Sequence, residues 1–143
     1  MLQLGKKNTL KVLRSVDFGF YLDAEDYDSV LLPIRYAPKD LKEGDEIEVF
    51  IYLDSEDRII ATTEEPFAEV GEFAYLKVKD MSKFGAFLDW GLPKDLFVPY
   101  REQKMRMERN KSYWVYIYID QETDRIAATA KIDRYLDKYN PPY

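Results

Sequence analysis

The stretch KFGAFLDWG, Lys83 to Gly91, decides the fold of this chain, because a closely similar stretch, DFGFYLDAE, stands at Asp17 to Glu25. In both, a Phe-Gly pair is followed by an aromatic residue, a leucine and an aspartate. Phe84 follows Phe18 by 66 residues. Two stretches of the same form indicate a repeated unit rather than a chance motif.

The same offset aligns most of the chain with itself. It holds from Gly5 and Gly71 as far as Asp54 and Asp120, after which the second copy carries one extra residue in a turn. We therefore predict two copies of one small domain, at residues 1–66 and 67–132, and a tail or linker at 133–143. The tail contains Asn-Pro-Pro, which would end a helix. It resembles a linker, so we expect a fragment, or a natural short form, of a longer protein.

Each copy shows the alternation of β-strands. Residues 47–54 alternate apolar with polar or aromatic side chains, and residues 113–120 repeat this pattern. Further strands are predicted at 10–16, 18–23, 30–34 and 58–63, with equivalents in the second copy. Five short strands in each copy favour a small closed barrel. The predicted fold class is all-β, with two tandem five-stranded OB-fold barrels.

Composition argues against most catalytic chemistry. The 143 residues include no cysteine and no histidine, which removes thiolate nucleophiles, the usual general base and the commonest metal ligands. Acidic pairs such as Glu25-Asp26 lack the spacing of a calcium-binding loop. No apolar run is long enough for a signal peptide or a membrane span. We expect a non-catalytic cytoplasmic protein without metal or cofactor.

The order of the motifs resembles a known domain. FGAFLD is followed by LFVPYRE and DRIAATAK, and the first copy has DFGFYLD, VLLPIRY and DRIIATT in the same order. This pattern resembles the S1-type RNA-binding domain, a variety of OB-fold. The tandem arrangement, with EVFIYLDSEDRIIATT and VGEFAYLKV, is similar to the amino-terminal part of the bacterial conserved virulence factor B family. The resemblance covers nearly the whole chain.

The resemblance implies that single-stranded RNA binds across one barrel face, with aromatic residues on the second and third strands and a basic residue near the last. Typical S1-type domains also have a ligand-contacting histidine where this chain has Pro33 and Pro99, which offer no donor. The matching positions are Phe84, Phe87 and Arg125 in the second copy, and Phe18, Tyr21 and Arg58 in the first.

Alternation divides the aromatic residues of the quoted stretch. It places Phe84 with Ala86 on the core side and Phe87 on the outside, unless a bulge at Gly85 turns both phenylalanines outward. Phe87 is therefore the better candidate for stacking a base. The sequence leaves the role of Trp90 open.

A second group of aromatic residues lies on the predicted strand 113–120. Trp114, Tyr116 and Tyr118 alternate with core residues, so they form an outward strip. Such a strip marks either packing against another domain or a surface that stacks RNA bases. Both hypotheses stay open.

Charge separates the two copies. Residues 1–66 carry a net charge of −7 and residues 67–143 a net charge of +1. Because phosphate binding needs cations, the second copy is the better candidate for RNA. Its predicted backbone contacts are Lys77, Arg101, Lys104 and Arg106, the last three in the basic segment 101–111.

We predict non-catalytic binding of single-stranded RNA in a post-transcriptional regulatory role, mainly by the second copy, with weak sequence preference. The main alternative is a protein-interaction or scaffolding module whose barrel faces pack on each other or on a partner protein. Besides RNA, the expected partners are a further C-terminal domain or a protein. A weaker one is oligosaccharide binding, which OB barrels also support.

Overall fold

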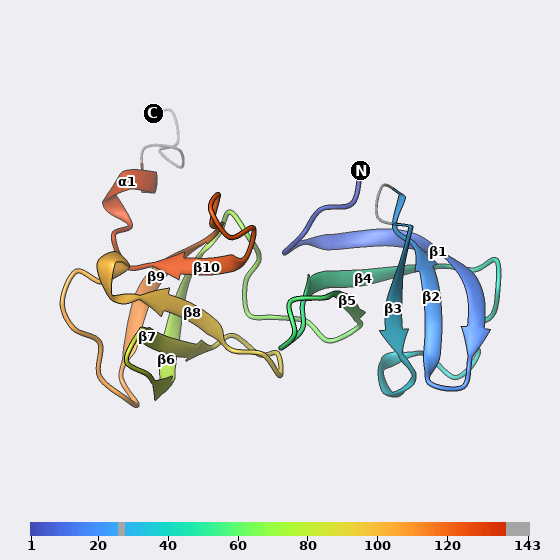
Figure 1. The fold of residues 1–143 in the computed structure, drawn as a ribbon, viewed down its shortest axis with the longest axis horizontal. Coiled ribbons are helices and arrows are strands. Elements are labelled where there is room, and N and C mark those ends of the chain that lie inside the picture. The colour runs from blue at the N-terminus through green and yellow to red at the C-terminus, as the bar shows by residue number, and fades with distance from the viewer. Residues whose placement is uncertain (26–27, 137–143) are drawn as a thin grey trace, which may run out of the picture. The chain divides into compact units, whose positions relative to one another are not determined.

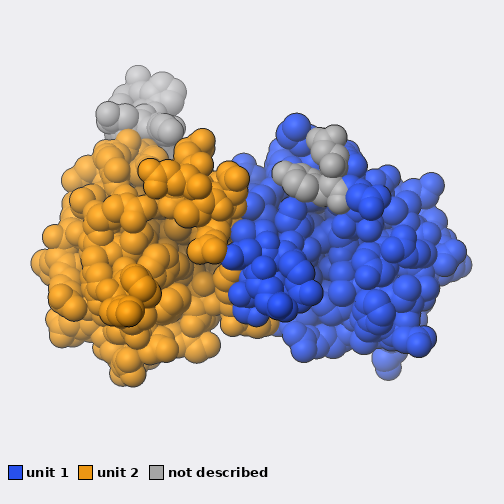
Figure 2. Space-filling view, viewed as in Figure 1, with its two compact units in different colours: residues 1–65 blue, residues 66–143 orange. Residues whose placement is uncertain are grey.

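The computed structural model describes residues 1–25 and 28–136. The chain divides into two compact units, residues 1–65 and residues 66–143 (Figure 2). Each unit contains one closed five-stranded barrel (Figure 1). The prediction of an all-β chain with two tandem OB-type barrels is confirmed. The predicted helix stop at Asn-Pro-Pro lies outside the described residues.

The first barrel has the strand order β1-β2-β3-β5-β4. Strands β3 and β5 pair in parallel, and the other pairs are antiparallel. A 3₁₀ turn, η2 (Ile34–Tyr36), follows β3. The strands are β1 (Lys7–Val16), β2 (Gly19–Asp23), β3 (Ser29–Pro33), β4 (Glu46–Leu53) and β5 (Ile59–Thr62).

The second barrel repeats this topology, in the order β10-β8-β7-β6-β9. A 3₁₀ turn, η3 (Tyr100–Glu102), follows β8, and a short helix, α1 (Asp133–Leu136), follows β10. The strands are β6 (Phe73–Met81), β7 (Gly85–Asp89), β8 (Leu96–Pro99), β9 (Ser112–Ile119) and β10 (Ile126–Thr129).

The core of each barrel is formed by the side chains that point inward from the strands, which are every second residue along each strand. In the second unit Val78, Leu88 and Val98 are fully buried, from β6, β7 and β8 in turn. Ile117 of β9 and Ala128 of β10 complete the ring. The opposite side chains of the same strands point outward, and they form the surfaces that can bind a ligand.

The glycine of the quoted stretch is required by a close backbone approach. Gly85 pairs with Pro99 across β7 and β8, and a Cβ added to it would lie 2.3 Å from the carbonyl oxygen of Val98. Gly19 has the same position in the first unit, with 2.2 Å to the carbonyl oxygen of Leu32. Each Phe-Gly pair therefore marks the point where the second strand begins against the third.

Phe84, which the sequence left between core and surface, lies on the surface. Strand β7 begins only at Gly85, so alternation does not extend back to Phe84, whose side chain is 66% exposed. The register shift lies in β6 instead, between Val78 and Asp80. Phe18 is exposed for the same reason, at 56%.

Trp90 is a structural residue. Its side chain is buried, and the indole N–H donates a hydrogen bond of 2.7 Å to the carbonyl oxygen of Lys94. The ring thereby holds the loop between β7 and β8 against the barrel.

Candidate nucleic-acid interface

An aromatic row crosses the outer surface of the second barrel. Phe87 on β7 pairs in register with Phe97 on β8, and their ring centroids lie 5.2 Å apart. Phe97 pairs with Ala127 on β10, which pairs with Tyr118 on β9. Ala127, which lies between Phe97 and Tyr118 in this pairing, is buried. We call Phe87, Phe97 and Tyr118, with the exposed Phe84, the aromatic face.

Phe97 was not among the residues predicted from the sequence. The alternation of the sequence could have identified it, because Leu96 and Val98 are buried residues of β8 and the residue between them must point outward. Pro99, which stands where typical S1-type domains have a ligand-contacting histidine, has a structural role. Pro99 is buried opposite Gly85, so this position supports the strand pairing rather than presenting a side chain to solvent.

Two cations lie over rings at the Phe84 end of the aromatic face. The Lys83 amine lies 5.2 Å from the centroid of the Phe84 ring, and the Arg106 guanidinium lies 4.8 Å from that of Tyr100. The backbone joins these groups, because the Tyr100 N–H donates to the Phe84 carbonyl oxygen at 3.3 Å. The Tyr100 hydroxyl also donates to the carbonyl oxygen of Ser82 at 2.7 Å. Positive charge and exposed aromatic surface are thus combined at this end.

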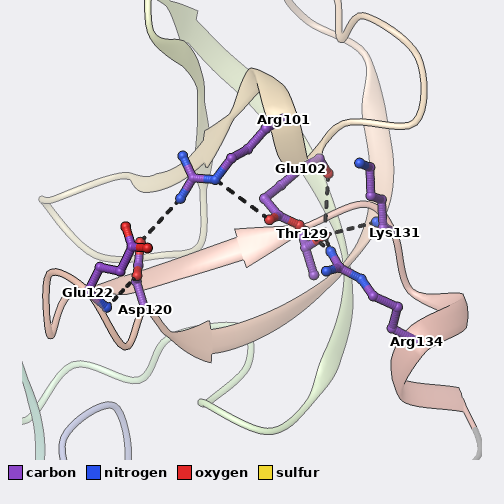
Figure 3. A network of polar contacts seen from close by, with 7 residues as sticks. All are labelled: Arg101, Glu102, Asp120, Glu122, Thr129, Lys131 and Arg134. Atoms are coloured by element: carbon purple, nitrogen blue, oxygen red, sulfur yellow. Dashed lines mark hydrogen bonds and ion pairs between the residues drawn. The ribbon is translucent and has the colours of Figure 1, made fainter.

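The other cations predicted in the basic segment are held by carboxylates. Arg101 Nη2 lies 3.5 Å from Asp120 Oδ2, and Arg101 Nε lies 3.9 Å from Glu102 Oε2 (Figure 3). Lys104 Nζ lies 3.0 Å from Asp133 Oδ2. Both cations are more than half exposed, so they keep contact with solvent while part of their field is cancelled.

Glu102 is the centre of the network in Figure 3. Its carboxylate accepts a hydrogen bond of 2.8 Å from the Thr129 hydroxyl and forms an ion pair with Arg134 of α1. Burial opposes ionisation of Glu102, but the contacts with Thr129 and Arg134 outweigh it and lower the pKa of this carboxyl group. Arg134 also donates to the Thr129 hydroxyl at 3.2 Å. The network fastens α1 to η3 and β10.

Arg125 and Arg58, which match the basic residue of S1-type domains, lie immediately before the last strand of their barrels. Arg125 is exposed, and its carbonyl oxygen accepts the Asp120 N–H at 2.8 Å. The Arg58 guanidinium is held by Asp54, at 3.0 Å, and by Glu56, at 2.7 Å. Lys77 lies exposed on β6, opposite Asp89 of β7.

The first unit lacks several features of this surface. Its Tyr21 corresponds to Phe87, but the Arg14 guanidinium lies 4.2 Å from the centroid of the Tyr21 ring and covers it. Phe18 meets Tyr21 edge-on, at 6.2 Å and 87°. At the positions 66 residues earlier, the first unit has Leu31, Asp17 and Asp40 in place of Phe97, Lys83 and Arg106. The structure therefore brings an open aromatic face and cations together in the second unit.

The outward strip of β9 is divided into three parts. Trp114 is 56% exposed and lies 5.5 Å from the ring of Tyr75. Tyr116 is buried beneath Tyr135 of α1, with ring centroids 4.0 Å apart and an interplanar angle of 12°. Burial, with the Glu102 carboxylate nearby, raises the pKa of Tyr118 to about 12. Neither hypothesis from the sequence anticipated that the chain's own helix covers the middle ring.

A groove lies beside Trp114. Its volume is about 230 Å³, and its lining is mostly apolar. The groove is lined by Lys104, Met105, Met107, Tyr113, Trp114, Ala130 and Ile132. Within residues 1–25 and 28–136, no group of His, Asp or Glu side chains could hold a metal ion, and no helix is long and apolar enough to span a membrane.

The comparison with known families agrees with this geometry. Residues 4–64 and residues 70–131 each match the S1 domain. The chain belongs to the S1 domain family. The two matches cover the two barrels separately, so the aromatic face of the second unit is a surface of an S1 domain.

Individual relatives are similar over part of their length. The uncharacterized protein YitL of Bacillus subtilis is 38% identical over 96 residues, which are 66% of this chain and 32% of that protein. Conserved virulence factor B of Staphylococcus aureus is 30% identical over 95 residues, which are 66% of this chain and 29% of that protein. The chain thus matches about a third of each relative.

The fold also matches a solved structure. A multidomain protein with nucleic acid binding domains from Streptococcus pneumoniae superposes with a TM-score of 0.75 and 21% identity. The match covers 98% of this chain and 50% of that chain. Both S1 domains are therefore included in the structural similarity.

Proposed function

We propose that this chain binds single-stranded RNA without catalysis, mainly through the aromatic face of its second S1 domain. The observation that carries the proposal is the row formed by Phe87, Phe97 and Tyr118, which crosses four paired strands with Ala127 between Phe97 and Tyr118. OB-type barrels bind single strands by stacking bases on such rings, and each stack contributes about 1–3 kcal/mol.

Cations of the second unit supply backbone contacts. Lys83 lies over the Phe84 ring, Arg106 lies over the Tyr100 ring, and Arg125 precedes β10. Lys77 extends the positive surface along β6, whereas Arg101 and Lys104 contribute less because carboxylates lie beside them. Stacking and phosphate contacts read few base edges, so the sequence preference is weak.

The first S1 domain has a secondary role in this proposal. Its net charge of −7 over residues 1–66 repels phosphate. Phe18 remains exposed, while Tyr21 and Arg58 are engaged by side chains of the same unit. These residues contribute little to RNA binding beside the second unit.

The similarity to a protein with nucleic acid binding domains supports this assignment. We place the protein in the cytoplasm, in a post-transcriptional regulatory role without cofactor or metal. Titration of the full chain into a fluorescently labelled single-stranded RNA tests the proposal, and unchanged anisotropy at low salt contradicts it.

A second candidate function is protein interaction, favoured by the exposed pair Tyr75 and Trp114. The first unit has Thr9 and Glu48 at these positions, so the barrel does not require the aromatic pair in order to fold. Met105, 72% exposed, extends the patch. The apolar groove beside it suits an uncharged protein segment better than a phosphate backbone.

Replacement of Trp114 by alanine separates these two functions. We expect the affinity for single-stranded RNA to change less than about twofold, because the ring lies off the aromatic face and a lost base stack would cost at least about fivefold. The measurement is the same anisotropy titration, with thermal unfolding as a control for folding. A loss of fivefold or more would show instead that Trp114 belongs to the RNA surface.

A further inference from the structure

The contact between Tyr135 and Tyr116 has the geometry of a base stacked on a ring. The two rings are nearly parallel, at 12°, and their centroids are 4.0 Å apart. The pairs Phe87–Phe97 and Tyr75–Trp114 are tilted by 42° and 49°. A flat aromatic group therefore fits on the outer face of Tyr116, and Tyr135 fills that place in this structure.

Tyr116 continues the aromatic face. It lies two residues from Tyr118 on β9, with its side chain on the same outer surface, at a spacing of about 7 Å along the strand. Phe73 of β6 lies beside it, with ring centroids 5.1 Å apart, and gives the position a second apolar wall. A strand of RNA that crosses Phe87, Phe97 and Tyr118 would meet Tyr116 next.

The helix that carries Tyr135 is weakly held. Within the part of the chain that the structure describes, helix α1 spans Asp133–Leu136, about one turn, and a single helical turn is not stable in water by itself. Among the described residues, its polar attachments include the ion pair of Arg134 with Glu102, the bond of Arg134 to Thr129, and the exposed pair of Asp133 with Lys104. The pair of Asp133 with Lys104 is exposed on both sides and adds little stability, and both ion pairs involve a half-exposed cation, so they weaken as salt rises. A competing ring could displace Tyr135 without unfolding the barrel.

We propose that Tyr116 is a concealed base-stacking position of the second S1 domain, and that a nucleobase of bound RNA takes the place of Tyr135. This inference rests on the proposed function and deepens it. Displacement of α1 makes one more ring available, and it also frees Glu102 from Arg134. The strength of the α1 contact thus sets part of the affinity for RNA.

The test is a titration of the full chain into fluorescein-labelled oligouridine. Tyr135→Ala is expected to raise the affinity about fivefold or more, because one base stack is gained without displacing a ring. Arg134→Ala is expected to raise it as well, although it removes a cation. Leu136→Ala, in the same helix and 42% exposed, is the matched control and should leave the affinity unchanged.

Tyr116 is tested by substitution in two backgrounds. Tyr116→Leu should leave the affinity of the otherwise unchanged protein within about twofold, since a base must displace Tyr135 to reach that ring. In the Tyr135→Ala background the same substitution should abolish the gain. Thermal unfolding checks that each variant is folded, and Arg134→Ala serves in place of Tyr135→Ala if the latter is not.

The outcomes separate this inference from the function on which it rests. If wild-type binding depends on Phe87 but the affinity of Tyr135→Ala and Arg134→Ala is unchanged or lower, the concealed position is refuted and the RNA-binding function stands. If the wild-type protein does not bind oligouridine at low salt, the proposed function fails and the inference fails with it.

Discussion

Phe87→Ala is expected to lower the affinity for single-stranded RNA by about fivefold to a hundredfold, the cost of one lost base stack. Phe87 lies at the start of the aromatic row, in contact with Phe97 and only half-buried, so one ring surface is available to a base. Fluorescence anisotropy with a labelled oligouridine measures the change.

The repeat supplies the matched control for this prediction. Tyr21 occupies the same position in the first unit, where Arg14 covers its ring and the surrounding charge is negative. Tyr21→Ala should therefore change the affinity less than about twofold, because no base stack is lost there. Equal losses for both substitutions would mean that the two S1 domains bind alike, and no loss for Phe87→Ala would mean that the row is not the binding surface.

Gly85→Ala is expected to lower the free energy of unfolding of the second unit by about 1–3 kcal/mol, the usual cost of forcing extra volume into a packed site. The added Cβ would lie 2.3 Å from the Val98 carbonyl oxygen and 2.8 Å from the Pro99 Cα. Both contacts are with backbone, which cannot move aside without breaking the pairing of β7 with β8. Urea unfolding followed by tryptophan fluorescence measures the change.

This readout is specific because both tryptophans, Trp90 and Trp114, belong to the second unit. Gly44→Ala is a control in the first unit. A Cβ there meets nothing within 4 Å, although φ is +92°. Because the first unit contains no tryptophan, this substitution should leave the fluorescence transition in place, which shows that the transition reports the second unit. An unchanged transition midpoint for Gly85→Ala would contradict the close approach of the two strands.

Repeat and alternation together made the fold predictable from the sequence. The offset of 66 residues depends only on identity between the copies, and the inward residues of β6 to β10 follow the period of two that a half-buried strand requires. The absence of long helical patterns left a small barrel as the packing solution. These features are local or repeated, so one sequence is enough to find them.

The site was less predictable, because it depends on where strands begin and on what covers them. The position of Phe84 stayed open in the sequence, because alternation does not extend past Gly85, the first residue of β7. Phe97 was missed although Leu96 and Val98 flank it as core residues. The cover of Tyr116 by Tyr135 could not be predicted, because it joins residues from two elements without a shared period.

The positive charge of the second unit is balanced by nearby carboxylates more than the sequence predicts. The basic segment 101–111 predicted a positive surface, but several of its cations lie beside carboxylates that are distant in sequence, such as Asp120, Asp133 and Asp80. Counting charges along the chain cannot reveal such pairs. Lys83 and Arg106, by contrast, lie over the rings of Phe84 and Tyr100.

The most direct test is a titration of the unmodified chain into labelled single-stranded RNA at two salt concentrations. With two or three phosphate contacts to a single strand, the affinity should be micromolar at low salt and should fall about tenfold between about 50 and 200 mM salt. Duplex RNA of the same length should bind more weakly, because its bases are not free to stack. No binding of the single strand at low salt would contradict RNA binding by this protein.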